Sequence, residues 1–237
     1  MEHAQTATEQ KPVFMPRVGS DNLVKTDMVR IERHVGFATR QKKKTLNDLH
    51  RVIKKKYGFK NVLELSSKSG NKLSFPLSPV SLKITNEEDG QQYSVENAYQ
   101  ASKVFKGGGP FVDLLDAAPR QAKKDERLIS SGEITGYDYF GMVWGLEPLT
   151  VFYDWLYVNA LKQNPHLHQE VLQYQAFTDI SFNPKKNVHC PAYSLAMFVA
   201  LHKRELLEGI EDPGTFYDLV TGFELSNTEH LLQEGWF

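Results

Sequence analysis

The chain has 237 residues, of which 41% are hydrophobic and 24% charged, with a formal net charge of -1 and one cysteine, Cys190. These values are typical of a globular protein that can bury a core, and a single thiol excludes a disulfide framework or a cysteine-based zinc site. No window approaches about 18 consecutive apolar residues, which excludes a membrane span. The polar start lacks the apolar region of a signal peptide, so we expect a cytoplasmic protein.

The charges are distributed unevenly along the chain. Residues 1–75 contain 16 basic and 7 acidic residues, whereas residues 76–237 contain 12 basic and 22 acidic ones. Such asymmetry indicates nucleic-acid contact by the basic part, although a solvated helix face is the alternative. Aromatic side chains interleave with the basic run, which favours a polyanion as the partner. The candidate DNA-binding residues are Arg40, Lys42, Lys43, Lys44, Arg51, Lys54 and Lys55.

Residues 1–12 show no periodicity and are expected to be disordered, and residues 13–60 are expected to form a basic N-terminal extension. Thr45 and Asp48 resemble a capping box at the start of a helix. Apolar residues then recur at helical spacing, and Gly58 is suited to end the helix. These residues are Leu46, Leu49, Ile53 and Tyr57.

Residues 61–65 are short and apolar-rich, as in a strand, and lead into a small polar turn. Hydroxyls, turn amides and a lysine can cradle phosphate, so Ser66, Ser67, Lys68 and Ser69 are candidate ligand-binding residues. The spacing is not that of a Walker loop, and a plain loop is the alternative. A second extended stretch, 80–84, precedes an acidic turn at 86–90, which predicts a hairpin.

Ser94 is predicted to cap the next helix. Glu96, Gln100 and Lys103 follow at i, i+4 and i+7, which places a carboxylate, an amide and an amine on one stripe. The stripe is either a candidate site or the solvated face of an amphipathic helix.

Residues 111–148 are expected to mix short helical pieces with glycine-rich turns, and residues 149–161 to form a buried helix. Pro165 fits the first turn of a further helix, and Pro191 opens another that extends to about residue 208. Residues 209–237 are expected to pack on the body. The resulting fold class is mainly α with a small β element, and residues 61–208 form its main domain.

Several common motifs are absent, including GxxxxGK[ST], GxGxxG, HExxH and GxSxG. His166 and His168 diverge on a helix and cannot form a metal pair. Cys190 follows His189 directly, and because adjacent side chains point apart, it is interpreted as a buried bystander thiol. No metal or cofactor is implied.

Two segments resemble the NADAR superfamily, also called YbiA-like, over about residues 61–205. The pattern S-x-E-x-x-x-Q-A-x-K-F recurs as Ser94, Glu96, Gln100, Ala101, Lys103 and, shifted by one, Phe105. The second match is the helix pair WLYVNALKQNPHLHQEVLQ, which begins at Trp155. Downstream, the expected W-G-x-G-x-x-G-x-N region is replaced, and only Asn187 is a counterpart. The resemblance implies a YbiA-like multihelical fold.

The stretch VLELSSKSG and the basic N-terminal part look like the branch encoded beside DarT-type toxins. The resemblance implies an antitoxin with N-glycosidase activity that removes ADP-ribose from guanine bases of DNA. Its partners would be ADP-ribosylated DNA, single-stranded or with the base flipped out, the product ADP-ribose, and a DarT-like toxin. The alternatives are an N-glycosidase acting on riboflavin-pathway metabolites and a non-enzymatic antitoxin that binds nucleic acid or the toxin.

The resemblance also gives the stripe a chemical interpretation. Glu96 would activate water and stabilise an oxocarbenium-like transition state, and Gln100 would orient the ribose hydroxyls. Lys103 would act as an acid, bind phosphate or form a Schiff base, with Lys68 as the second candidate amine. Asn97 and Asn187 are further candidate ligand-binding residues. Trp144, Tyr153 and Trp155 would stack on a base or pack in the core.

Overall fold

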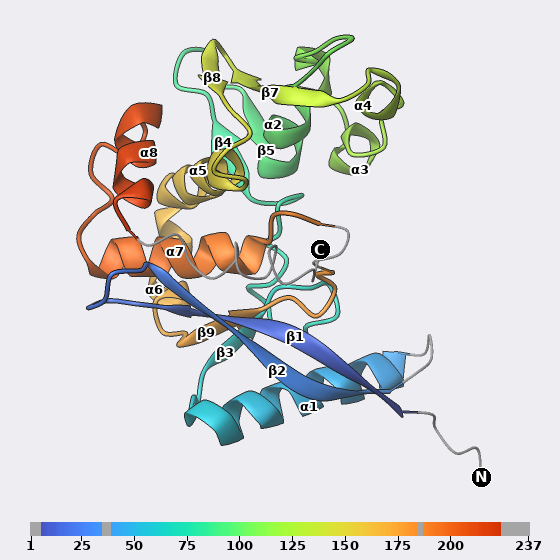
Figure 1. Ribbon diagram of the computed structural model, residues 1–237, viewed down its shortest axis with the longest axis vertical. Coiled ribbons are helices and arrows are strands. Elements are labelled where there is room, and N and C mark those ends of the chain that lie inside the picture. Colours follow the sequence, from blue (N-terminus) through green and yellow to red (C-terminus); the bar gives the residue numbers. More distant parts are fainter. Residues whose placement is uncertain (1–5, 35–38, 184–186, 224–237) are drawn as a thin grey trace.

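The computed structural model describes residues 6–34, 39–183 and 187–223 (Figure 1). Within these ranges the strands form one four-stranded, one three-stranded and one two-stranded sheet beside the helices. The prediction of a mainly α fold is therefore wrong, and the protein is a mixed α/β protein. Most of the strands are only three residues long, which is too short to show the alternation of apolar and polar residues that reveals a strand in a sequence.

The largest sheet contains the N-terminal part of the chain. Its strand order is β2-β1-β9-β3, and its members are β1 (Thr6–Pro16), β2 (Val24–His34), β9 (Ala176–Thr178) and β3 (Val62–Glu64). β1 and β2 form a long antiparallel hairpin, β1 joins β9 through Phe14 and Phe177, and β3 runs parallel to β9. Residues 6–12, expected to be disordered, thus lie in a strand, and residues 1–5 lie outside the described residues.

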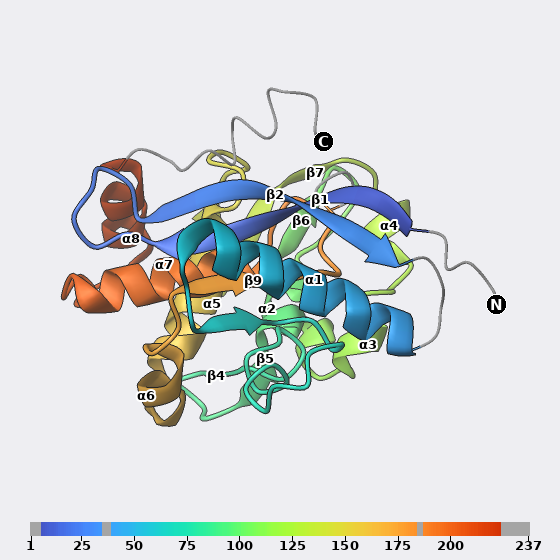
Figure 2. The ribbon, with the colours of Figure 1, turned by 90° about the horizontal axis from the view of Figure 1, so that it is seen from below.

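The basic helix α1 (Thr39–Tyr57) covers one face of this sheet (Figure 2). Leu46, Leu49 and Ile53 pack with apolar residues of the hairpin, including Val29 and Ile31. The predicted spacing is confirmed, as is the end of the helix: Gly58 has a φ of +72° and its N–H donates to the carbonyl of Lys54. Burial of this apolar stripe leaves the basic side chains on the opposite face of the helix.

The start of α1 differs from the prediction, because the helix begins at Thr39 rather than near Thr45. Thr45 and Asp48 therefore lie inside the helix and do not form a capping box. They accept hydrogen bonds from the backbone N–H groups of His34, at 3.1 Å, and Glu32, at 2.7 Å, on the edge strand β2. The helix thus satisfies two outward-facing donors of the sheet edge.

Two buried helices, α7 (Pro191–Lys203) and α5 (Val151–Lys162), form the centre of the molecule. α7 packs on the opposite face of the sheet from α1, and α5 packs against α7 (Figure 1). The predictions of a buried helix at 149–161 and of a helix opened by Pro191 are confirmed, although α7 ends at Lys203 rather than near residue 208.

The other two sheets flank the short helix α2 (Val95–Ala101). β4 (Lys83–Thr85) and β5 (Gln92–Ser94) form the predicted hairpin, and the side chain of Ser94 accepts a hydrogen bond from the N–H of Asn97, which confirms the predicted cap. The helix stops at Ala101, so Lys103 is not on it. Lys103 begins β6 (Lys103–Phe105), which pairs with β7 (Ile134–Tyr139), and β8 (Met142–Trp144) completes that sheet.

Short helices complete the described fold: η1 (Val112–Leu115), α3 (Pro119–Ala122), α4 (Arg127–Ser130), η2 (Pro165–Leu167), α6 (His168–Val171) and α8 (Pro213–Thr221). α8 buries Phe216 and Val220 against the body, and residues 224–237 lie outside the described residues. Within the described ranges, every helix is too short or too polar to span a membrane.

Candidate functional site

Glu96 and Gln100 form a buried polar pair one turn apart on α2. Their residues are only 5% and 4% exposed, which excludes a solvated helix face. Gln100 Nε2 donates a 2.8 Å hydrogen bond to Glu96 Oε1, and the ammonium of Lys123 lies 3.5 Å from Glu96 Oε2. Gln100 Oε1 is buried without a partner among the described residues. An unused buried acceptor costs stability, so it marks a place where a ligand hydroxyl or a water can bind.

Lys103 lies beside this pair although it belongs to a strand. Its ammonium sits 4.7 Å from the centre of the Tyr99 ring. The pKa of Lys103 is lowered to about 8, chiefly by burial; the Glu96 carboxylate opposes this effect and the nearby charge of Lys123 adds to it. Near neutral pH, an appreciable fraction of this amine is therefore unprotonated, as nucleophilic lysines require.

His189 is a site residue that the sequence did not reveal. Its ring stacks on Tyr153, with 4.0 Å between centroids, and meets the edge of Tyr99 at 4.5 Å. Burial, together with the charges of Lys103 and Lys123, lowers the pKa of His189 to about 3, so the imidazole is neutral at physiological pH. A lone histidine far along the chain from α2 carries no spacing signal, and only the fold brings it to Tyr99 and Lys103.

Cys190 follows His189 and begins the approach to α7. The thiol is buried and burial raises its pKa well above the usual value, so it is not a ready nucleophile. This environment agrees with the interpretation of Cys190 as a bystander.

The polar loop Ser66–Ser69 lies where the parallel strands β3 and β9 end. Glu64, at the end of β3, is buried and accepts hydrogen bonds from Ser66 N–H, Thr178 Oγ1 and Ile180 N–H. The loop closes on itself, because Ser69 N–H donates to the Ser66 carbonyl and Lys68 N–H to Ser66 Oγ. Three of its amides therefore already have partners, and the Ser67 hydroxyl and the Lys68 ammonium are the groups best able to reach a ligand.

Electrostatic effects relate both the loop and α2 to the neighbourhood of His189 and Cys190. The charge of Asp179, which follows β9, contributes to the raised pKa of Cys190, and the charge of Glu96 contributes to the raised pKa of Tyr153. Lys68 in turn lowers the pKa of Asp179 against the larger effect of burial. The carboxyl ends of parallel strands are a common position for ligand sites in α/β proteins.

The remaining predicted site residues occupy different environments. Asn97 donates to the carbonyls of Leu114 and Ala117, so its amide joins α2 to the following segment. Trp144 and Trp155 pack against each other and Phe152 in the core, and Trp155 Nε1 donates to the Ile210 carbonyl. Asn187 is exposed, two residues before His189. Their contacts with a ligand stay predictions.

The predicted DNA-binding residues other than Lys42 lie on the face of α1 that points away from the sheet. Those whose side chains the structure describes are exposed: Arg40, Lys43, Lys44, Arg51, Lys54 and Lys55. Arg51 forms an ion pair with Asp48, whereas the side chain of Lys42 lies outside the described part. The arrangement is a strip of positive charge along one helix.

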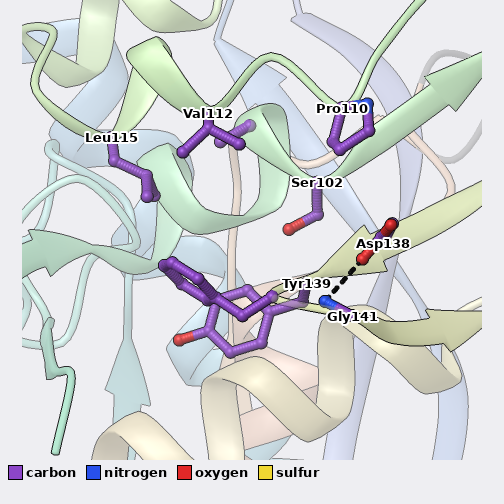
Figure 3. Close-up of a pocket in the computed structure, with 9 residues that line it drawn as sticks. Ser102, Pro110, Val112, Leu115, Asp138, Tyr139 and Gly141 are labelled. Atoms are coloured by element: carbon purple, nitrogen blue, oxygen red, sulfur yellow. Dashed lines mark hydrogen bonds between the residues drawn. The ribbon is translucent and has the colours of Figure 1, made fainter. Parts of the chain in front are cut away.

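A separate pocket of about 240 Å³ lies beyond the end of α2 (Figure 3). Its walls are mainly apolar, and the hairpin turn at Phe140 and Gly141 closes one side. None of Glu96, Gln100 and Lys103 lines it. The lining residues are Ala101, Ser102, Pro110, Val112, Leu115, Asp138, Tyr139, Phe140 and Gly141. In the described part of the chain, no three His, Cys, Asp or Glu side chains gather in a way that could hold a metal ion.

The protein is a mixed α/β protein whose candidate site is enzyme-like. It consists of a buried carboxylate on α2 that is held by an amide and has two lysines nearby. The family model for the DarT1-associated NADAR antitoxins matches residues 9–230, so the chain belongs to this family of antitoxins. The resemblance noted in the sequence is confirmed. The match begins within β1, so the hairpin and α1 belong to the region that the family shares. No curated protein matches the chain significantly.

Proposed function

We propose that this antitoxin is an N-glycosidase that removes ADP-ribose from guanine bases of DNA and thereby reverses the modification made by a DarT-like toxin. The observation that carries this proposal is the buried Glu96, oriented by Gln100 and bordered by Lys103 and Lys123. Family membership supports the link to a DarT toxin. The basic strip on α1 supports DNA as the carrier of the modification.

The reaction breaks the C–N bond between the anomeric carbon of the ribose and the guanine. In the direct route, Glu96 takes a proton from a water whose oxygen bonds to the anomeric carbon, while the guanine leaves with the bonding electrons and takes a proton from the Lys103 ammonium. Charge on Glu96 also stabilises the oxocarbenium-like transition state. The unused Oε1 of Gln100 is placed to accept a hydrogen bond from a ribose hydroxyl.

A second route uses Lys103 as the nucleophile. The neutral amine bonds to the anomeric carbon as guanine leaves, the sugar ring opens to an iminium, and water then releases ADP-ribose and restores the amine. The lowered pKa of Lys103 favours this route, because burial beside a second ammonium is an environment that activates lysines. In it, Glu96 serves as the base that moves protons between Lys103 and water.

DNA would be held by α1 while the modified base enters the site. Backbone phosphates bind lysine and arginine without reading sequence, and a base attached to ADP-ribose is reached in a single strand or after flipping. Arg40, Lys43, Lys44, Lys54 and Lys55 present their charges to solvent along the helix. A hydrolase of free nucleotides would not need them.

The deciding experiment follows release of ADP-ribose from a guanine-ADP-ribosylated single-stranded oligonucleotide. The wild type should release it, and Glu96→Gln should lose about 10²-fold or more of the rate. Glu126→Gln, at an exposed carboxylate on the neighbouring segment, is the matched control and should retain activity. No release by the wild type, together with protection by Glu96→Gln in cells that express the toxin, would contradict the proposal and favour an antitoxin that acts by binding.

A further inference from the structure

We propose that Lys123 binds the pyrophosphate of ADP-ribose, and that in the free protein it rests on Glu96. This inference depends on the proposed function, because it concerns the ligand of the same site. Lys123 follows α3, and its side chain is 60% exposed, whereas that of Glu96 is 6% exposed. The ammonium thus comes from the surface and contacts, at 3.5 Å, a carboxylate on the floor of the site.

The charges around Glu96 do not balance. The ammonium groups of Lys103 and Lys123 lie close enough to repel each other, since the charge of Lys123 contributes to the lowered pKa of Lys103. Glu96 is the carboxylate that faces both of them, and His189 is neutral. The site therefore has an excess of positive charge when Lys103 is protonated, and an anionic ligand would balance it.

Two acidic residues on the segments next to α3 form their ion pairs with Arg127 and not with Lys123. Asp113 and Asp125 both bind Arg127, with the shortest contacts at 2.6 Å and 2.8 Å. Two of the carboxylates around α3 are thus already paired. A diphosphate, with several acceptor oxygens, is the group in ADP-ribose that can accept hydrogen bonds from both lysine ammonium groups.

The Ser66–Ser69 loop is less suited to this role than its composition indicated. A phosphate cradle needs free backbone N–H groups, yet those of Ser66, Lys68 and Ser69 all donate within the protein. Lys68 remains the competing cation on that side of the site. The structure therefore distinguishes two positions for the pyrophosphate, and the charge excess favours the one at Lys123.

Movement of Lys123 would link ligand binding to the contacts that the Glu96 carboxylate makes. A single contact made by a mostly exposed side chain is weak, so the lysine can leave Glu96 for a diphosphate at small cost. Its departure leaves Glu96 Oε2 without this contact, so the oxygen can accept a hydrogen bond from water once the ligand is in place. Lys123 thus has a binding role and, through Glu96, a positioning role.

Calorimetric titration with ADP-ribose tests the assignment. Lys123→Met should weaken binding by about 10-fold or more, while Lys123→Arg, which keeps the charge, should restore most of it. Lys124→Met is the matched control at the adjacent exposed lysine and should bind as the wild type does. Lys68→Met tests the competing position and should weaken binding less than Lys123→Met does. With the modified oligonucleotide, Lys123→Met should raise KM more than it lowers kcat.

Equal affinity of Lys123→Met and the wild type for ADP-ribose, or a loss confined to Lys68→Met, would overturn the assignment. If the wild type still releases ADP-ribose from DNA in that case, the proposed function stands and only the role of Lys123 is wrong. If the wild type neither binds nor releases ADP-ribose, the proposed function fails and the assignment fails with it.

Discussion

Gln100 donates its hydrogen bond to Glu96 from one turn further along α2, and both side chains are buried. The amide thus fixes the orientation of the carboxylate and keeps its own oxygen unused. We expect Gln100→Leu to lower kcat by about 10- to 100-fold, because a misplaced catalytic group loses much of its effect. Gln121→Leu, at an exposed amide on α3, should change little. Unchanged kcat in Gln100→Leu would show that Glu96 needs no such support.

The activity should depend on the protonation of Lys103, whose pKa lies near 8. If the amine is the nucleophile, kcat/KM rises with pH through this value, because the amine loses its proton there. Lys103→Arg should abolish turnover, and sodium borohydride should trap a covalent adduct with the wild type. A rate that falls with pH through 8, without trapping, would instead assign Lys103 a role as a cation or acid.

Asp154 makes the stability of the fold depend on pH. Burial raises the pKa of its carboxyl to about 7, although Ser194 and Thr150 donate hydrogen bonds to it. Because the folded-state pKa lies above the unfolded value, the free energy of unfolding should fall as pH rises from about 4 to 7. Asp154→Asn should remove this loss, which amounts to at most about 4 kcal/mol at pH 8. Denaturant unfolding at pH 4 and pH 8 measures it, with the exposed Asp21→Asn as the control.

Removal of the hydroxyl group should change the stability of the fold differently at two tyrosines of α5, Tyr153 and Tyr157. Tyr157 donates a 2.6 Å hydrogen bond to the buried Leu77 carbonyl, whereas the Tyr153 hydroxyl is buried without a partner among the described residues. Tyr157→Phe should destabilise the fold by about 1–2 kcal/mol, and Tyr153→Phe should leave stability unchanged or raise it slightly. Thermal unfolding of the two variants checks this. A large loss in Tyr153→Phe would mean that its hydroxyl has a structural partner.

Charge reversal on α1 should weaken the binding of single-stranded DNA. Lys43→Glu with Lys44→Glu should lower affinity and reduce the slope of log affinity against log salt by about 1.4, because about two phosphate contacts are lost. Lys83→Glu with Lys203→Glu changes the net charge equally at exposed lysines on other elements. Fluorescence anisotropy at several salt concentrations compares them. An equal loss in both double variants would indicate a general charge effect rather than a binding face.

The sequence predicted the elements that depend on local rules. The Ser94 cap, the apolar spacing of α1 and the helix opened by Pro191 all follow from interactions within a few residues. The β1–β2 hairpin was missed because the first half of β1 is mostly polar and shows no apolar alternation, and because the apolar half joins β9, which is far along the chain.

The candidate site was predictable only in part, for the same reason. Glu96 and Gln100 lie on one helix and share a spacing signal, whereas Lys103 reaches them from a strand after the helix has ended. Lys123 lies in the turn after α3 and His189 lies before α7, and no pattern in the sequence links them to α2. The occupied amides of the Ser66–Ser69 loop are likewise visible only once the buried Glu64 is in place.

The hydrogen bonds from Glu32 and His34 to α1 would fix the position of bound DNA relative to the sheet. They fix the helix to β2, β2 pairs with β1, and β1 joins β9, from which the chain proceeds toward His189. Hydrogen bonds therefore connect the basic strip, through the sheet, to β9. In the proposed function, this connection sets a fixed distance along the DNA strand, counted in nucleotides, between the phosphates held on α1 and the base whose ADP-ribose is removed.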